Sequence, residues 1–359
     1  MENSEQNNKF IVIISLLLGI FVLPNRLIQE NIIKINNKDN ITQVSSININ
    51  NVRINDYNDH SLSISKMRQY QYDGSQLTLE QKIDSDGDYD KYIASYISDN
   101  LKIYGLLTIP HGQMPDNGWP AIIFNHGYIR PNKYKTTAYY KPYIRSLSNA
   151  GYVVFMPDYR GHDKSQGEPD SQYFSTSYTI DALNAMASIK NFKYSNPDKI
   201  GMWGHSDGGN VIMRALLIKP EDIKVAVIWG GVMASYDILT SDWQQMVTYQ
   251  QPEYDLKIEN KHMDELIKSY GWPKDNPEFW RTIDPLNYLS EIITPIQLHV
   301  GEKDEEVPTK FSEDLHNNLL SLNKISEYYN YPNGDHNIIN PNYHLAMQRT
   351  IEFFDKYLK

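Results

Sequence analysis

Short runs of apolar residues alternate with amphipathic stretches along most of the chain. Runs that are apolar throughout predict buried strands, whereas apolar residues three and four positions apart predict helices. The expected strands are Ala121–Phe124, Tyr152–Met156, Lys199–Trp203, Val225–Trp229, Ile296–Val300 and Glu327–Tyr331. The expected helices cover residues 139–150, 178–190 and 344–358, with another from about residue 211. Buried strands that alternate with helices predict an α/β fold, with a mostly parallel, doubly wound sheet covered on both faces.

Two longer runs come before this alternation. Tyr92–Ile97 and Leu101–Pro110 flank the turn residues Ser98-Asp99-Asn100. Turn residues between two apolar runs predict an antiparallel hairpin, so we expect a mixed sheet. From about Ser61 onward the pattern is already strand-like, and we place the start of the folded domain there, at residues 61–359.

One connection is too long for an ordinary crossover. More than sixty residues rich in Trp, Tyr and Phe separate Trp229 from Ile296, with a helical patch near residues 263–270. Long insertions of this kind commonly cover an active site. We expect a cap at residues 233–290, with Trp243, Trp272 and Tyr128 lining the substrate pocket. The alternative is an elaborated crossover that only packs.

The N-terminal region has a different composition. Residues 10–23 form an apolar run after Lys9, with the length of a signal-peptide core. We expect residues 1–24 to be a signal peptide or, preferably, an uncleaved signal anchor, followed by a polar tether at 25–60. Either implies an extracytoplasmic location, secreted or attached to the membrane through this segment. The alternative is a buried N-terminal helix.

The amino-acid composition excludes several classes of function. The net charge is −10 without a basic stripe, which argues against a nucleic-acid partner. The chain has no cysteine, which excludes disulfides, thiolate metal sites and a cysteine nucleophile. The His and acidic residues show no metal-ligand spacing, so we expect neither metal nor cofactor. Nothing in the sequence indicates the oligomeric state.

The stretch Gly204-His205-Ser206-Asp207-Gly208 fits G-x-S-x-G and lies between an expected strand and an expected helix. In that context the serine occupies a sharp turn that presents its hydroxyl as a nucleophile. Ser206 is therefore the candidate nucleophile. The alternative is a glycine-rich turn that merely packs closely.

A serine nucleophile needs a base and an acid that orients the base. His336 follows the last expected strand, and Asp304 follows the strand at 296–300, with Glu302, Glu305 and Glu306 as rival acids. The chain order Ser, Asp, His is that of one class of hydrolases.

The reaction also needs donors for the developing oxyanion. The backbone N–H of Asp207 is one candidate, and that of Tyr128, in the loop after the strand at 121–124, is the other. The Tyr128 hydroxyl is a further candidate donor. His126 is expected to be a hydrogen-bonded core residue.

From about Tyr92 to its end, the chain resembles the α/β-hydrolase superfamily, and within it the hydrolase domain of prolyl-oligopeptidase-type peptidases and related acyl esterases. The matching stretches are Asn125–Gly127, Asp158–His162, Gly204–Gly209, Gly301–Pro308 and Gly334–His336. The resemblance implies an α/β-hydrolase fold, Ser206 as nucleophile, His336 as base and Asp304 as orienting acid, with Arg160 structural. Asp163 and Asp207 depart from the family's pattern, and Asp207 puts a carboxylate beside the oxyanion site.

We therefore expect a serine hydrolase that cleaves carboxylic ester bonds through an acyl-enzyme. A serine-type peptidase with the same machinery is the main alternative, and a catalytically silent binding module is a further one. The expected partner is a small ester or a short peptide substrate.

Overall fold

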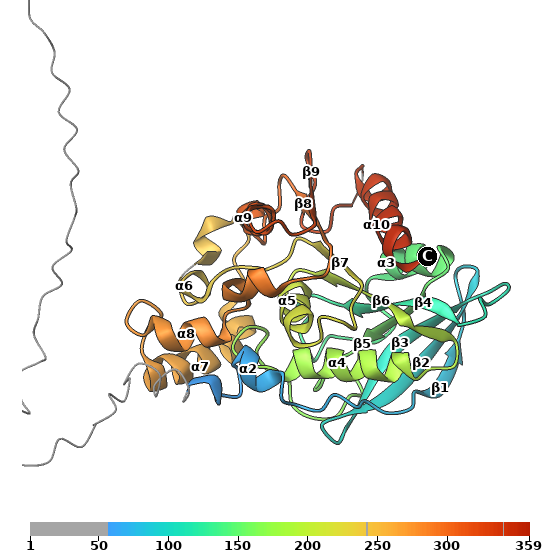
Figure 1. The fold of residues 1–359 in the computed structure, drawn as a ribbon, viewed down its shortest axis with the longest axis horizontal. Coiled ribbons are helices and arrows are strands. Elements are labelled where there is room, and N and C mark those ends of the chain that lie inside the picture. Colours follow the sequence, from blue (N-terminus) through green and yellow to red (C-terminus); the bar gives the residue numbers. More distant parts are fainter. Residues whose placement is uncertain (1–56, 242, 340) are drawn as a thin grey trace, which may run out of the picture. The chain divides into compact units, whose positions relative to one another are not determined.

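The computed structural model describes residues 57–359 except Asp242 and Asn340. The described residues form a nine-stranded sheet with strand order β1-β2-β3-β5-β4-β6-β7-β8-β9 (Figure 1). The strands are β1 Thr78–Ile83, β2 Tyr89–Ser98, β3 Leu101–Pro110, β4 Trp119–Asn125, β5 Val153–Pro157, β6 Ser195–His205, β7 Val225–Trp229, β8 Ile296–Gly301 and β9 Ser326–Tyr331.

The sheet is mixed, as the sequence predicts. Strands β1, β2, β3 and β5 pair antiparallel in that order, whereas β5, β4, β6, β7, β8 and β9 pair parallel. The expected hairpin is β2–β3, in which Ser98 pairs with Leu101. Its two central residues, Asp99 and Asn100, both have positive φ (49° and 62°), a conformation that Asp and Asn tolerate in tight hairpin turns.

Helices cover both faces because successive residues of a buried strand point to opposite sides. On β4, Ala121 and Ile123 join the core under helices α4, α5 and α9, whereas Ile122 and Phe124 join the core under α3 and α10. Figure 1 shows α3 and α10 together on one side of the sheet and α4 and α5 on the other. These helices are α3 Lys141–Asn149, α4 Ser177–Lys190, α5 Gly208–Ile218, α9 Thr309–Ser321 and α10 Tyr343–Leu358.

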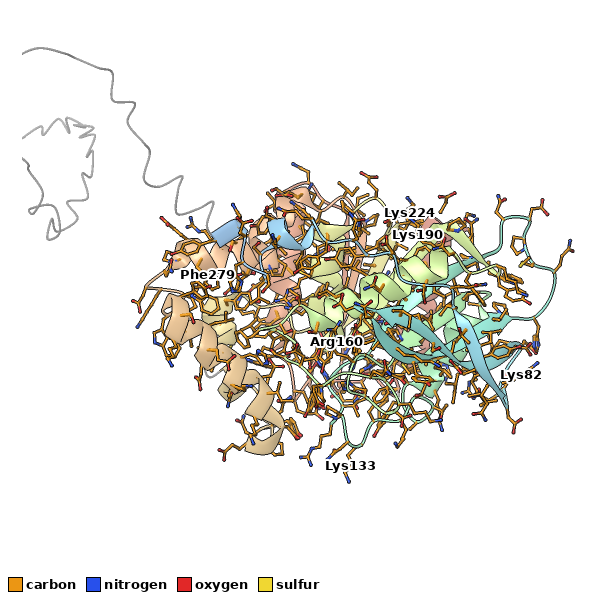
Figure 2. The ribbon with its side chains drawn as sticks, turned by 90° about the horizontal axis from the view of Figure 1, so that it is seen from below. Lys82, Lys133, Arg160, Lys190, Lys224 and Phe279 are labelled. Carbon is orange, nitrogen blue, oxygen red and sulfur yellow. The ribbon has the colours of Figure 1, made fainter. Side chains whose placement is uncertain are left out.

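The long connection between β7 and β8 is helical. It contains α6 Tyr236–Leu239, the 3-10 helix η1 Trp243–Met246, α7 Glu253–Tyr270, α8 Pro277–Ile283 and the 3-10 helix η2 Pro285–Glu291. Its apolar residues form a separate core with Phe174 and Phe311. Phe279 is fully buried within this insertion (Figure 2).

The start of the domain differs from the sequence prediction. Residues after Ser61 are not a strand: Ile64–Met67 form the short helix α2, capped by the Ser63 hydroxyl, and the first strand begins at Thr78. The packed region also reaches further back than residue 61, since the ring of Tyr57 contacts that of Phe279 with centroids 5.7 Å apart.

The expected signal segment at 1–24 and nearly all of the expected tether at 25–60 lie outside the described residues. Among residues that are described, no helix is both long and apolar enough to span a bilayer.

Candidate active site

Ser206 lies on a strained turn between β6 and α5. Its φ is +54°, a left-handed conformation that costs a non-glycine residue about 1–3 kcal/mol. Three backbone bonds hold it there: Ser206 N–H donates to Trp229 O at 2.9 Å, and Ser206 O accepts from Gly209 N at 2.9 Å and Val232 N at 3.0 Å. Ser206 remains partly exposed while the residues on both sides of it are buried.

The two glycines of the G-x-S-x-G pattern are required because neighbouring atoms come too close to leave room for a Cβ. A Cβ on Gly208 would lie 2.1 Å from the Asn125 carbonyl oxygen, and a Cβ on Gly204 would lie 2.7 Å from Cδ1 of Ile212. The end of β4 therefore packs directly on the start of α5. The G-x-S-x-G pattern follows from this contact and from the tight turn itself.

His336 and Asp304 meet at the carboxyl end of the sheet. Nδ1 of His336 lies 2.8 Å from Oδ2 of Asp304, and the side chains are 4% and 1% exposed. The other carboxylate oxygen, Oδ1, accepts the backbone N–H groups of Glu306 at 2.9 Å and Val307 at 2.8 Å. Of the four candidate acids in this loop, Asp304 is the one that bonds to the imidazole.

Ser206 and His336 face the same cavity, of about 310 Å³, which Gly127, Tyr128 and Glu306 also line. Burial alone would lower the pKa of His336. The hydrogen bond that His336 donates to Asp304 and the negative charges of Asp304, Glu306 and Asp207 outweigh the effect of burial, and the pKa of His336 is raised above 6.5. The protein thus stabilises the protonated form of His336, which is the form that a general base reaches when it takes up a proton.

The expected oxyanion loop lies against the nucleophile. A Cβ on Gly127 would lie 2.8 Å from Cβ of Ser206, so the residue before Tyr128 must be small. The Tyr128 hydroxyl points elsewhere: it lies 3.4 Å from Asp255 Oδ1. The backbone N–H of Tyr128 forms a hydrogen bond with the Asp207 carboxyl, which helps to lower the pKa of Asp207 against the effect of burial.

A hydrogen-bond chain that the sequence did not reveal links the oxyanion loop to the base. Gly127 N–H donates to the Tyr140 hydroxyl at 3.0 Å, and this hydroxyl lies 2.9 Å from Nδ1 of His205. Nε2 of His205 lies 3.1 Å from the carbonyl oxygen of His336. A carbonyl only accepts, so Nε2 carries the proton and Nδ1 accepts from Tyr140. Burial lowers the pKa of His205 to about 3, which keeps this ring neutral.

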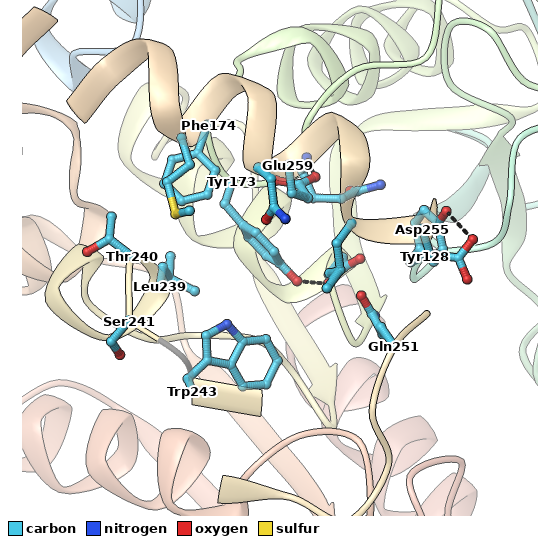
Figure 3. Close-up of a pocket in the computed structure, with 15 residues that line it drawn as sticks. Tyr128, Tyr173, Phe174, Leu239, Thr240, Ser241, Trp243, Gln251, Asp255 and Glu259 are labelled. Carbon is cyan, nitrogen blue, oxygen red and sulfur yellow. Dashed lines mark hydrogen bonds between the residues drawn. The ribbon is translucent and has the colours of Figure 1, made fainter. Parts of the chain in front are cut away.

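The carboxyl of Asp207, directly after the nucleophile, is turned away from bulk water. Asp207 is 4% exposed and accepts a hydrogen bond from the Tyr173 hydroxyl (Figure 3). Burial raises the pKa of Asp207 to about 6 against the opposing effect of that bond. Asp207 lines a second cavity, beside the one that holds Ser206.

The two expected pocket tryptophans have different surroundings. Trp243 lines the second cavity together with Asp207. Trp272 is 45% exposed and is not among the residues that line either cavity.

Three other residues named from the sequence, His126, Arg160 and Asp163, form hydrogen bonds or ion pairs with residues other than Ser206. His126 is buried, with Nδ1 2.8 Å from Gly127 O. Arg160 forms an ion pair with the fully buried Asp181, with 2.7 Å between the guanidinium and the carboxylate. Asp163 accepts from Lys135 Nζ at 2.7 Å. Within the described part of the chain, no group of three or more His, Asp or Glu residues is arranged to hold a metal ion.

The architecture matches known hydrolases. The acetyl xylan esterase from Paenibacillus sp. R4 aligns with a TM-score of 0.60 and 16% identity, over 84% of this chain and 93% of that one. The Pyrococcus horikoshii acylaminoacyl peptidase aligns with a TM-score of 0.58 and 20% identity, over 76% of this chain and 42% of that one. The fold is that of the α/β-hydrolases.

The family follows from the sequence. The model of the prolyl oligopeptidase family matches residues 138–359, more than half of the chain, and the chain belongs to that family. It is a serine hydrolase, as the sequence predicts.

Two of the relatives found by sequence are peptidases by name. The uncharacterized peptidase YtmA of Bacillus subtilis (strain 168) is 28% identical over 248 residues, which cover 68% of this chain and 85% of the relative. Human dipeptidyl peptidase 8 is 27% identical over 196 residues, which cover 50% of this chain. This match spans only 21% of dipeptidyl peptidase 8.

Proposed function

We propose that Ser206, His336 and Asp304 form a catalytic triad that hydrolyses carboxylic esters through an acyl-enzyme. The observation that carries this proposal is the buried His336–Asp304 pair, 2.8 Å apart, in front of the cavity that the strained Ser206 also lines. A buried acid on Nδ1 leaves Nε2 as the nitrogen that takes up a proton.

In the proposed reaction, Oγ of Ser206 attacks the acyl carbon while its proton moves to Nε2 of His336. The carbonyl oxygen becomes an oxyanion that accepts from the backbone N–H groups of Asp207 and Tyr128. Such a donor contributes about 3–4 kcal/mol to the stability of the transition state. The oxyanion collapses, the alcohol leaves with the proton from His336, and a water molecule then repeats the sequence on the acyl-enzyme.

The same groups would cleave an amide, and hydrolysis of peptide or aminoacyl amide bonds is the second candidate function. Its support is the family and the peptidase names of two relatives, YtmA and dipeptidyl peptidase 8. The ester proposal has comparable support from the esterase of similar length that shares the fold. Rates on matched acyl esters and acyl amides would separate the two.

The decisive test uses the nucleophile. The purified full chain should react with a fluorophosphonate probe and hydrolyse short 4-nitrophenyl esters. Ser206→Ala should abolish both, whereas Ser321→Ala, at an exposed serine on α9, should change neither. A Ser206→Ala variant that still turns over these esters would contradict the proposal. An intact chain that the probe does not label would instead favour the silent binding module.

Two further proposals concern the rest of the chain. The insertion between β7 and β8 acts as a cap, and the residues of α7 that line the two cavities support this proposal.

The N-terminal segment directs the domain outside the cytoplasm and holds it at the membrane, and the apolar run at 10–23 supports this second proposal. Fractionation of expressing cells with and without residues 1–24 tests the second proposal, since it requires membrane recovery of the full chain and its loss on truncation.

A further inference from the structure

A second cavity, here called the acidic cavity, adjoins the nucleophile. It has a volume of about 290 Å³ and shares Tyr128, Gln251 and Asp255 with the cavity that contains Ser206 and His336. Asp207 lines it directly after Ser206 in the chain. A group attached to the acyl part of a substrate bound at Ser206 would therefore have this cavity within reach.

Among the described residues, three carboxylates line the acidic cavity, and no Lys, Arg or His does. Asp255 is compensated by Arg130, with Nε–Oδ1 and Nη2–Oδ2 distances of 2.5 and 2.7 Å. Asp207 and Glu259 take part in no ion pair within the described residues. Their hydrogen-bond donors among the described residues are neutral. Asp207 accepts from the Tyr173 hydroxyl and the Tyr128 backbone N–H, and Glu259 accepts from the Tyr173 backbone N–H and, both at 2.5 Å, from the Ser171 hydroxyl and the Gln172 N–H.

An independent feature of the same cavity indicates a missing donor. Gln172 lines it and is 5% exposed, yet its side-chain Oε1 has no hydrogen-bond partner among the described residues. A buried acceptor without a partner costs free energy. In the part of the chain that the structure describes, the acidic cavity thus combines two carboxyls that form no ion pair and one oxygen without a hydrogen-bond partner.

We propose that the acidic cavity binds a primary ammonium group on the acyl part of the substrate, an inference that rests on the proposed role of Ser206. An ammonium carries three N–H donors and no acceptor. Asp207, Glu259 and the Oε1 of Gln172 supply three acceptors for it. The two carboxyls add two negative charges above their pKa values of about 6 and about 7. Opposite charges in a site of low dielectric attract strongly, and hydrogen bonds to charged groups are the strong ones.

The other side of the cavity suits the carbon chain that bears the amine. Phe174, Leu239 and Trp243 line it, and in Figure 3 Trp243 lies on the opposite side of Tyr173 from Glu259. Apolar side chains bury methylene groups, and an indole face attracts a cation. The bound cation would also neutralise Asp207 next to the oxyanion site, which explains how a carboxylate is tolerated there.

The ammonium has two chemical sources: the α-amino group of an aminoacyl compound or peptide, or an amine at the far end of the acyl chain. Three 4-nitrophenyl esters of equal chain length distinguish them, namely hexanoate, 2-aminohexanoate and 6-aminohexanoate. We expect kcat/KM for at least one amino ester to exceed that for hexanoate by about tenfold or more. The preferred isomer identifies the source.

Substitutions of the two carboxylates test whether they cause the preference for the amino ester. Glu259→Gln and Asp207→Asn should each reduce the ratio of amino ester to hexanoate by about tenfold or more. Glu265→Gln removes an exposed charge from the same helix, α7, and should leave the ratio unchanged. A wild-type chain without preference for either amine would overturn the proposal, as would an equal ratio in Glu259→Gln and Glu265→Gln.

A binding measurement separates this proposal from the proposed reaction. n-Hexylamine should raise the melting temperature of the full chain, 1-hexanol should not, and Glu259→Gln should lose the effect. If Ser206 fails to react with a fluorophosphonate, the proposed reaction is wrong, and the amine shift alone still decides whether the cation site exists. No shift with n-hexylamine, together with no preference among the esters, would exclude the site.

Discussion

The imidazole of His336 and the carboxylate of Asp304 are held together by groups on both sides of their 2.8 Å contact. Two backbone N–H groups fix Oδ1 of Asp304, so that Oδ2 faces the ring. A carboxylate fixed in this way selects the tautomer of His336 that has its proton on Nδ1. The acid is thus defined by its hydrogen bonds, whereas the sequence offered four acids within five residues of one another.

Asp304→Asn tests this relationship. The amide would turn its N–H toward Nδ1 and stabilise the wrong tautomer, so kcat should fall by about 10³–10⁴ with little change in fold. Steady-state ester kinetics and far-UV circular dichroism measure the two effects. Glu302→Gln is the control in the same loop, because Glu302 is exposed and accepts from Asn333 N at 3.0 Å. Equal losses in the two variants would refute the assignment.

The pH profile reports the state of His336. The base must be neutral, and the pKa of His336 is raised, so kcat/KM for a neutral ester should rise with pH and reach its half-maximum above pH 6.5. Asp304, Glu306 and Asp207 supply the negative charges that stabilise the imidazolium. Glu306→Gln removes one of them and should move the midpoint to lower pH. A midpoint that stays in place or moves upward would show that another group controls the profile.

The parallel part of the fold could be predicted because its signal is local. Val225–Trp229 is an uninterrupted apolar run, and the structure has β7 at these residues. Strand β1 gives no such signal: Thr78–Ile83 is an edge strand with five of its six residues exposed. Helix α9 was missed although its buried residues Phe311, Leu315 and Leu319 carry a four-residue spacing.

The residues of the candidate site could be predicted only where their order along the chain indicates their position in the fold. Ser206, Asp304 and His336 each follow a strand, and parallel strands bring their carboxyl ends to one edge of the sheet. The contacts of Tyr140 with His205 depend on tertiary packing and have no sequence pattern. Asp207 and Glu259, which both line the acidic cavity, come from the turn after β6 and from the insertion, and no sequence pattern connects them.

Tyr140→Phe tests the chain that joins the oxyanion loop to the base. The change leaves Gly127 N–H and His205 Nδ1 without a partner, and each unsatisfied buried group costs about 1–3 kcal/mol. We expect kcat to fall about tenfold or more while KM changes little, because the loop position matters most in the transition state. A loss confined to thermal stability, with kcat intact, would show that the chain only supports the fold.

The matched control for this change is Tyr70→Phe, at a tyrosine that is 40% exposed and lines neither cavity. It removes the same hydroxyl from a solvated position, so both kcat and stability should stay at the wild-type level. A similar loss of kcat in this variant would point to a general effect of removing a phenol.

The acidic cavity should also make stability depend on pH in an unusual direction. Burial raises the pKa of Glu259 from 4.5 to about 7, so between these values the folded chain holds a proton that the unfolded chain has released. The free energy of unfolding must then fall as pH rises through this window, on the order of 3 kcal/mol from this group. Asp207, whose pKa is raised to about 6, acts in the same direction.

Glu259→Gln cannot ionise, so its stability should not show this loss. The variant loses some hydrogen bonding at pH 5, where we expect it to be less stable than the wild type, and the difference should shrink or reverse at pH 8. Denaturant unfolding at the two pH values measures it, with Glu265→Gln expected to follow the wild type at both. A gap between Glu259→Gln and the wild type that is the same at pH 5 and pH 8 would mean that Glu259 is already ionised in the folded chain at pH 5.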